Sequence, residues 1–176
     1  MAAELWRGAT ITHRIVPIAE EHIEGFRAAV DSVAREHRFL AFLEAPPLEA
    51  VRDFVLGNIR SGQPQFVAIA DDAVVGWCDV LPKPRPVYRH SGVLGIGVID
   101  TYRRRGIGTA LLEPTLQAAR AKGLTRIELT VRTDNERAKA LYEKFGFVVE
   151  GVCRRDMCIN GVYQDSFLMA ALYEAA

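Results

Sequence analysis

The spacing of apolar residues divides the chain into helical and strand-like stretches. Residues 20–39 carry apolar side chains every three to four positions, which predicts a helix with one buried face. The same spacing resumes at Leu48, directly after two prolines, and predicts a second helix that ends near Gly62. A β-branched stretch precedes both helices, so we expect a first strand at Ala9–Ile18.

Shorter apolar runs bounded by turn residues predict six more strands. They cover Gln65–Ala70, Val74–Val80, Ser91–Ile99, Thr125–Val131, Val148–Ile159 and Gln164–Ala171. Asn160-Gly161 favours a hairpin between the last two of these strands. Helical runs at Gly108–Lys122 and Asn135–Phe145 separate the later strands, and Pro114 predicts a kink in the first of these helices.

The resulting order of elements, β α α β β β α β α β β, predicts the fold class. We expect one α/β domain over residues 1–176, with a mixed, mostly antiparallel central sheet and helices on both faces. The stretch 81–89 contains three prolines, which cannot pair within a central strand. It is therefore predicted to be a long surface loop.

A strand, a glycine turn and a helix follow one another in the middle of the chain. The apolar run 93–99 leads into Arg103-Arg104-Arg105-Gly106-Ile107-Gly108. Gly106 and Gly108 lack Cβ atoms, so an anion can approach main-chain N–H groups there, and the helix that follows directs its positive end to the same place. The turn has neither the Gly-Lys-Ser/Thr of a nucleoside-triphosphate loop nor the third glycine of a dinucleotide fingerprint. It predicts a site for a diphosphate, with further positive charge from three arginines.

The predicted helix 135–145 carries a second motif. Asn135 and Tyr142 are seven residues apart, about two turns, so their side chains share one helix face with the small Ala138 between them. About 10 Å of helix axis separates the two ends, which suits a helix that runs beside an extended ligand. Asn135 has a second interpretation as the N-cap of the helix, and it can serve in both ways. The alternative for Tyr142 is a core residue between helix and sheet.

These two motifs together resemble the GNAT family of N-acetyltransferases, and the tail 150–170 is similar to its amino-acid and phosphinothricin-type branch. The pattern is Arg103-x-x-Gly106-x-Gly108, then Asn135-x-x-Ala138-x-x-Leu141-Tyr142-x-x-x-Gly146-Phe147. The resemblance implies the acyl-CoA N-acyltransferase fold, acetyl-CoA as acyl donor and no metal. It also implies a central strand that carries a bulge and splays from its neighbour. The residues that it places against the coenzyme are Gly97, Val98, Ile99, Arg103, Arg104, Arg105, Gly106, Ile107, Gly108, Thr109, Asn135 and Ala138.

The same resemblance makes Tyr142 the catalytic residue. A phenol with a pKa near ~10 is protonated at neutral pH and can donate to the thiolate that leaves when an amine attacks the thioester directly in a ternary complex. The group that takes the proton of the amine stays open between Asp79, Glu44, His90 and a chain of water molecules. One or more of the three arginine side chains is expected to reach a phosphate.

The acceptor is predicted to be the primary amine of a small amino-acid-like molecule. Arg85, Arg89 and His90 lie beside the proline-containing loop and could hold a substrate carboxylate. The resemblance leaves a polyamine, a ribosomal protein or a protein N-terminus open as alternatives. An alternative of another class is a non-catalytic acyl-CoA sensor, or a module for another nucleotide. Tyr142 counts against a sensor, because a pure binder needs no proton donor.

Composition narrows the expected partners and location. Twenty-two Lys and Arg balance twenty-two Asp and Glu, so no overall basic field attracts nucleic acid or an anionic membrane. Cys78, Cys153 and Cys158 lack metal-ligand spacing, and a low, odd number suits a reducing compartment. The chain shows no signal peptide and no apolar run long enough for a membrane span. We expect a cytoplasmic enzyme, which the resemblance further implies is a homodimer.

Overall fold

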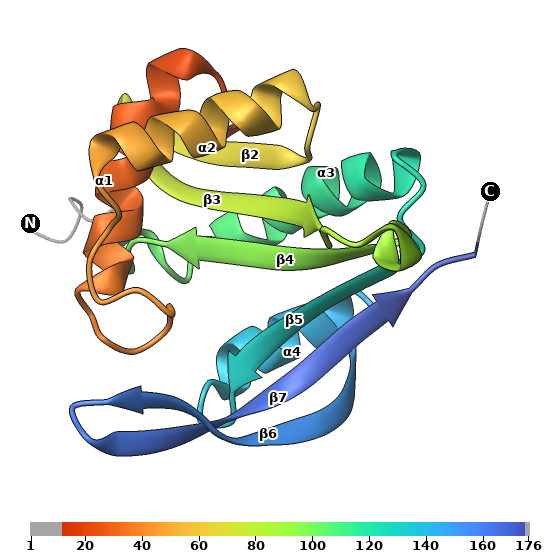
Figure 1. The fold of residues 1–176 in the computed structure, drawn as a ribbon. Helices are drawn as coiled ribbons and strands as arrows, with labels where there is room; N and C mark the ends of the chain where they lie inside the picture. Colours follow the sequence, from red (N-terminus) through yellow and green to blue (C-terminus); the bar gives the residue numbers. More distant parts are fainter. Residues whose placement is uncertain (1–11, 175–176) are drawn as a thin grey trace, which may run out of the picture.

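A seven-stranded sheet organises the protein, for which a computed structural model describes residues 12–174 (Figure 1). The strands are β1 (Arg14–Pro17), β2 (Gln65–Ala70), β3 (Ala73–Pro82), β4 (Ser91–Val98), β5 (Arg126–Arg132), β6 (Val148–Ile159) and β7 (Val162–Leu172). The α-helices are α1 (Ile23–Ala34), α2 (Leu48–Arg60), α3 (Ile107–Ala121) and α4 (Glu136–Lys144). The strands lie in the order β1-β2-β3-β4-β5-β7-β6, and only β4 and β5 are parallel. The predicted fold class and element order are confirmed.

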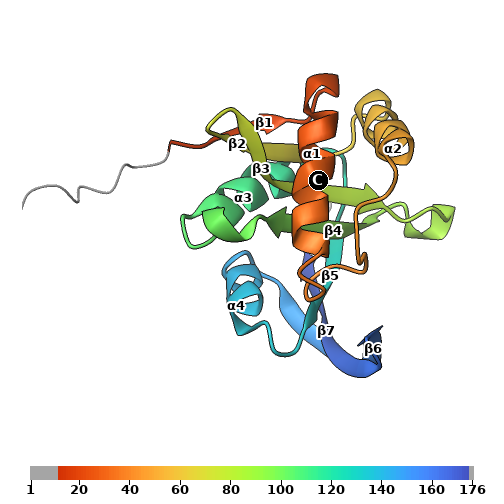
Figure 2. The ribbon, with the colours of Figure 1, turned by 90° about the vertical axis from the view of Figure 1, so that its left-hand side faces the viewer.

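Two hydrophobic cores lie on opposite faces of the sheet. Because side chains alternate along a strand, Trp77 of β3 enters the core under α1 and α2, while Cys78 enters the core under α3 and α4. Figure 2 shows these helix pairs on the two sides of the sheet. Trp77 meets the ring of Phe26 edge to face, with 5.8 Å between the ring centres. Burial of large apolar side chains of this kind contributes about 1.5–3 kcal/mol each.

The central strands β4 and β5 separate after three residue pairs. Their pairing covers Ser91 to Val93 on β4 and Arg126 to Glu128 on β5, and the strands then diverge (Figure 1). This splay agrees with the expectation, but the expected bulge is absent from the pairing of β4 with β3, which keeps one register from Gly92 to Val98. The gap opens because β5 follows β7, with which it pairs along its whole length. Residues 94–98 of β4 are left without a strand partner on that side.

Several predicted boundaries need correction. The helix predicted over 20–39 begins with a short 3-10 turn and its α-helical part ends at Ala34. It stops there because Glu36 and His37 donate to carbonyls three residues back, and His37 then takes a left-handed φ of 50°. The strand predicted at 9–18 covers only Arg14–Pro17 within the described residues, and positions 9–11 lie outside them.

Other turn predictions match the structure more closely. Asn160 and Gly161 have φ values of 51° and 78°, as a tight hairpin turn between β6 and β7 requires. Pro114 lies inside α3, which continues through it to Ala121, so the proline does not end the helix. Strand β3 extends to Pro82, and a 3-10 turn, Pro86–Tyr88, breaks up the predicted proline loop. Within residues 12–174, no helix has the length and apolar character to cross a membrane.

Candidate active site

The glycine turn connects the open end of β4 to α3. Gly106 is the N-cap of α3, with φ 77° and ψ −2°, a left-handed conformation that glycine adopts without strain. The first helical hydrogen bond runs from the N–H of Ala110 to the carbonyl of Gly106, at 3.0 Å. The N–H groups of Ile107, Gly108 and Thr109 therefore have no acceptor within the helix. A Cβ at Gly106 would meet no atom within 4 Å, so the turn itself is uncrowded. Unpaired N–H groups at the start of a helix are suited to bind an anion.

The three arginines of the turn have different surroundings. Arg103 donates from Nε to the carbonyl of Val98, at 2.8 Å, and its guanidinium is ion-paired with Glu36. Arg105 lies over the ring of Tyr102, with 5.1 Å to the ring centre. Arg104 is exposed, and its side chain forms no hydrogen bond, ion pair or ring contact with any residue from 12 to 174. Of the three, Arg104 is the side chain that is free to reach a phosphate.

The open edge of β4 is formed by alternate residues. The N–H of Ile99 donates to the carbonyl of Val75 on β3, at 3.0 Å. Because antiparallel pairing alternates, the main chain of Gly97 also faces β3, and the main chains of Ile96 and Val98 face the gap beside β5. Of the three predicted main-chain contacts, Gly97, Val98 and Ile99, only Val98 therefore has a main chain that faces the gap.

Ile96 was missed because the alternation depends on the pairing with β3, which the sequence does not give. Gly97 has another reason to be glycine. A Cβ there would lie 2.2 Å from the ring of Trp77, so the indole packs directly on the main chain. A glycine in a strand marks such a close approach as readily as it marks a ligand.

Asn135 and Tyr142, at the two ends of α4, differ in their hydrogen bonding and burial. The side chain of Asn135 accepts a hydrogen bond from the N–H of Ala138 at 3.2 Å, so its N-cap interpretation is confirmed. Tyr142 is 8% exposed and packs against Phe147. Its hydroxyl has no hydrogen-bond partner among the described residues. Burial, with a smaller contribution from the Cys78 thiol, raises the pKa of Tyr142 far above its ordinary value, so the phenol stays protonated.

Asp79 lies on the other face of the sheet, one residue pair away. Cys78, the neighbour of Tyr142, pairs with Ile96, and Asp79 pairs with Gly95. The carboxylate Oδ1 lies 3.1 Å from the position that a Cβ on Gly95 would occupy. The phenol and the carboxyl thus approach the same short stretch of β4 from opposite faces.

Asp79 is buried without a partner. It is 6% exposed and makes no hydrogen bond within the described residues, and burial raises its pKa to about 7. On the adjacent strand Gln65 pairs with Asp79 and is 2% exposed. Gln65 accepts a hydrogen bond from Asn58 at 2.9 Å, but its own Nε2 has no partner. A polar row therefore reaches the open strand from α2 through β2 and β3.

The other predicted polar residues lie further away. Glu44 is exposed and paired with Arg35 at 3.4 Å. His90 is exposed at the closed end of β4, where its carbonyl accepts from the N–H groups of Thr125 and Arg126. The side chains of Arg85 and Arg89 are exposed beside the 3-10 turn. Of the candidates for proton acceptor, only Asp79 borders the open part of β4.

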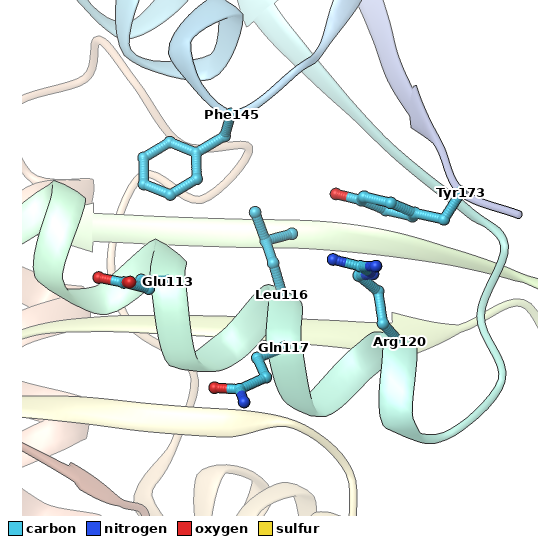
Figure 3. Close-up of a pocket in the computed structure, with 6 residues that line it drawn as sticks. All are labelled: Glu113, Leu116, Gln117, Arg120, Phe145 and Tyr173. Atoms are coloured by element: carbon cyan, nitrogen blue, oxygen red, sulfur yellow. The ribbon is translucent and has the colours of Figure 1, made fainter. Parts of the chain in front are cut away.

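Two hollows in the described part of the chain contain none of the predicted site residues. Figure 3 shows a pocket of about 420 Å³ lined by residues of α3 with Phe145 and Tyr173, in which Arg120 stacks on Tyr173 at 4.8 Å. Arg120 is about 20 Å along the helix axis from Ile107, so this pocket lies away from the glycine turn. Within residues 12–174, no group of three His, Cys, Asp or Glu side chains could hold a metal ion.

Comparison with known proteins gives a consistent picture. A sequence model described as the acetyltransferase (GNAT) family matches residues 26–147. The chain is 36% identical over 112 residues to the L-amino acid N-acetyltransferase AaaT of Escherichia coli, covering 63% of this chain and 69% of that protein. It is 35% identical over 119 residues to an N-alpha-acetyltransferase of Saccharolobus solfataricus, covering 60% and 66%. A phosphinothricin acetyltransferase (Pat) from Sinorhizobium meliloti, solved in complex with AcCoA, has the same fold, with a TM-score of 0.86 and 19% identity over 94% of this chain and 91% of that one.

Proposed function

The chain belongs to the acetyltransferase (GNAT) family, and on this premise we propose that it transfers an acetyl group from acetyl-CoA to the primary amine of a small amino-acid-like molecule. The observation that carries the proposal is the open edge of β4, which ends in a left-handed glycine turn and has a partnerless phenol on one face and a partnerless carboxyl on the other. The amine attacks the thioester directly while both substrates are bound.

The donor side of the site fits an extended coenzyme. The free N–H groups at the start of α3 would hold the diphosphate, and the exposed Arg104 would add positive charge beside it. The main chain of Ile96 and the N–H of Val98 would pair with the amides of the pantetheine arm, as a strand partner would, while the carbonyl of Val98 already accepts from Arg103. The related fold of the Sinorhizobium meliloti protein, which was solved with AcCoA, supports acetyl-CoA as the donor.

Two side chains would move the protons. Asp79 accepts a proton from the ammonium form of the acceptor, so that the neutral amine can form the new C–N bond. Tyr142 donates its proton to the sulfur as the C–S bond breaks, and the proton that the amide nitrogen then loses restores the phenol. The raised pKa of Tyr142 makes it a donor at every physiological pH, and that of Asp79, at about 7, allows it to accept a proton near neutrality.

Two acceptors are supported by relatives of comparable identity. The Escherichia coli relative is an L-amino acid N-acetyltransferase, which favours a free amino acid. The Saccharolobus solfataricus relative is an N-alpha-acetyltransferase, which favours a protein N-terminus as the second candidate. Both carry an α-amine, and an α-amine with a pKa near ~8 loses its proton far more readily than a lysine side chain. A cytoplasmic location and a homodimer complete the proposal, and sedimentation of the purified protein tests the latter.

The experiment is a release of free thiol from acetyl-CoA in the presence of separate acceptors. A panel of L-amino acids, spermidine and peptides with a free N-terminus would be compared at equal concentration, with the acetylated product identified by mass spectrometry. We expect amino acids to be acetylated fastest. Faster acetylation of peptides would establish the second candidate. If no acceptor in the panel supports release of thiol, the proposed enzyme is refuted.

A further inference from the structure

The segment 35–39, which follows α1 directly, lies at the open ends of the two splayed strands. We name it the bridging segment. Arg103, just after β4, holds it through Glu36, and Arg132, the last residue of β5, holds it through the carbonyl of Arg38 at 3.2 Å. In Figure 1 this part of the chain descends from α1 past the tip of β4 toward the end of β5. Both anchors are at the carboxyl ends of strands that have already diverged.

The anchor on the β4 side fixes both distance and orientation. Arg103 and Glu36 are joined by two parallel N–H···O contacts, from Nη1 to Oε2 at 2.8 Å and from Nη2 to Oε1. The guanidinium also lies 5.0 Å from the ring centre of Phe39, and its Nε holds the carbonyl of Val98. The side chains of Arg103 and Glu36 are only 21% and 26% exposed, so water weakens the pair less than at an open surface.

The anchor on the β5 side is more deeply buried. Arg132 is 11% exposed and donates to both carboxylate oxygens of Asp134, at 3.0 and 2.6 Å, and to Gln164 of β7 at 3.1 Å. Its remaining contact is the carbonyl of Arg38. His37, between the two anchored residues, has a left-handed φ of 50°, which costs a non-glycine residue about 1–2 kcal/mol. The bridging segment is thus held in a conformation that it would not adopt by itself.

We propose that Arg103 and Arg132 are positioning residues that hold the bridging segment across the open end of the β4–β5 gap, where it forms a wall of the acceptor site. This inference rests on the proposed function. Tyr142 and the start of α3 occupy one face of the gap, so the acceptor must enter from the face of α1, from which the bridging segment extends. The side chain of Arg103 then serves acceptor binding and not the diphosphate.

The test compares binding of the two substrates in variants of the clamp. Glu36→Gln keeps the shape of the side chain and removes its charge, and Arg103→Gln removes the other partner. Both are expected to raise the KM for the acceptor roughly tenfold through misplacement of the wall. Glu36→Gln, which leaves the contact of Arg103 with Val98 in place, is expected to leave the affinity for acetyl-CoA, measured by calorimetry, unchanged. The double variant is expected to be no worse than either single variant, because the two residues act as one unit. As a control, Arg52→Gln breaks an exposed ion pair with Glu20 on the far end of the helical layer and is expected to change neither value.

A measurement that needs no turnover distinguishes failure of the clamp from failure of the proposed function. Hydrogen exchange, followed by mass spectrometry of peptides spanning 35–45, should quicken in Glu36→Gln and not in Arg52→Gln. Unchanged exchange in Glu36→Gln, or a loss of acetyl-CoA affinity in Glu36→Gln with an unchanged KM for the acceptor, would overturn the clamp. A wild-type protein that acetylates no amine while Glu36→Gln still loosens the segment would instead refute the proposed function and leave a purely structural clamp.

Discussion

Replacement of Asp79 by Asn should make the protein more stable and far less active, and both effects should depend on pH. Burial raises the pKa of Asp79 from its ordinary 3.8 to about 7. The folded protein therefore keeps this proton up to pH 7, whereas the unfolded chain releases it near pH 4, so the contribution of Asp79 to stability falls as pH rises through that window. At about 1.4 kcal/mol per pH unit, the ionised carboxylate costs roughly 4 kcal/mol above pH 7.

Asn is neutral at every pH and escapes that cost. Its amide would be buried without a partner, which costs about 1–3 kcal/mol, so the net gain above pH 7 is about 1–3 kcal/mol. A domain of this size should then melt several degrees higher, at about 2–4 °C per kcal/mol. At pH 5 the folded carboxyl is protonated and only about 1.2 pH units, or roughly 1.6 kcal/mol, of that cost remains. This is no more than the buried amide costs, so the gain should disappear. Thermal unfolding of both proteins at pH 5 and pH 8 measures this difference.

Activity should change in the opposite direction. For the wild type, kcat/KM should fall about tenfold for each pH unit below 7, because Asp79 becomes protonated and cannot take the proton of the amine. Asp79→Asn should lose about 10²–10⁴ in kcat/KM at pH 8 and show no acidic limb of this kind. Glu44→Gln is the matched control, since Glu44 is an exposed carboxylate on a loop. If Asp79→Asn keeps the acidic limb, or if its change in melting temperature is the same at pH 5 and pH 8, Asp79 is not the proton acceptor and the water chain becomes the better explanation.

Three further substitutions test the rest of the site. Tyr142→Phe removes the proposed proton donor, so kcat should fall about 100-fold or more. Because the hydroxyl has no protein partner, the melting temperature and the acetyl-CoA affinity should stay unchanged. An unchanged single-turnover rate of thiol release would contradict this. Arg104→Gln should weaken acetyl-CoA binding several-fold and reduce its dependence on salt in calorimetric titrations, because an exposed charge is screened; equal affinity at low salt would speak against a phosphate contact. Gly97→Ala would place a Cβ 2.2 Å from Trp77 and should lower stability by about 1–3 kcal/mol in urea unfolding, and a neutral effect would mean that the indole moves easily.

Local periodicity explains what the sequence predicted well. Strands β2 and β6 have the predicted bounds, Gln65–Ala70 and Val148–Ile159, because turn residues delimit each apolar run. The end of α1 was predicted five residues too late. Residues 35–39 are polar and aromatic residues that a helix tolerates, and outside the helix Glu36 and Arg38 are held by distant arginines. A contact of that kind overrides a local preference and leaves no periodic signal.

In the candidate site, too, local features could be predicted from the sequence and long-range contacts could not. Helix geometry fixes the relation of Asn135 to Tyr142, so their spacing could be read directly. The partner of Arg103 is 67 residues away in the chain, and nothing in the arginine triplet distinguishes the side chain that clamps a segment from the one that stays free. The direction of each main-chain group on β4 depends on its pairing with β3, so the sequence located the strand and could not tell Ile96 from Gly97.

The strongest physical argument for a site comes from groups that folding leaves unsatisfied. The phenol of Tyr142, the carboxyl of Asp79 and the Nε2 of Gln65 belong to buried residues and lack hydrogen-bond partners among the described residues, and of these atoms only the Nε2 of Gln65 is wholly enclosed. A wholly enclosed polar atom without a partner costs about 1–3 kcal/mol, and an apolar residue of similar size in place of Gln65 would remove that cost. All three gather within adjacent residue pairs of β2, β3 and β4 and beside α4, at the point where the sheet opens. Among residues 12–174, the Nε2 of Gln65 is the one buried side-chain nitrogen or oxygen that is wholly enclosed without a partner. Because stability alone would select against this arrangement, the polar groups at the opening are best explained by the substrates and protons that they would bind.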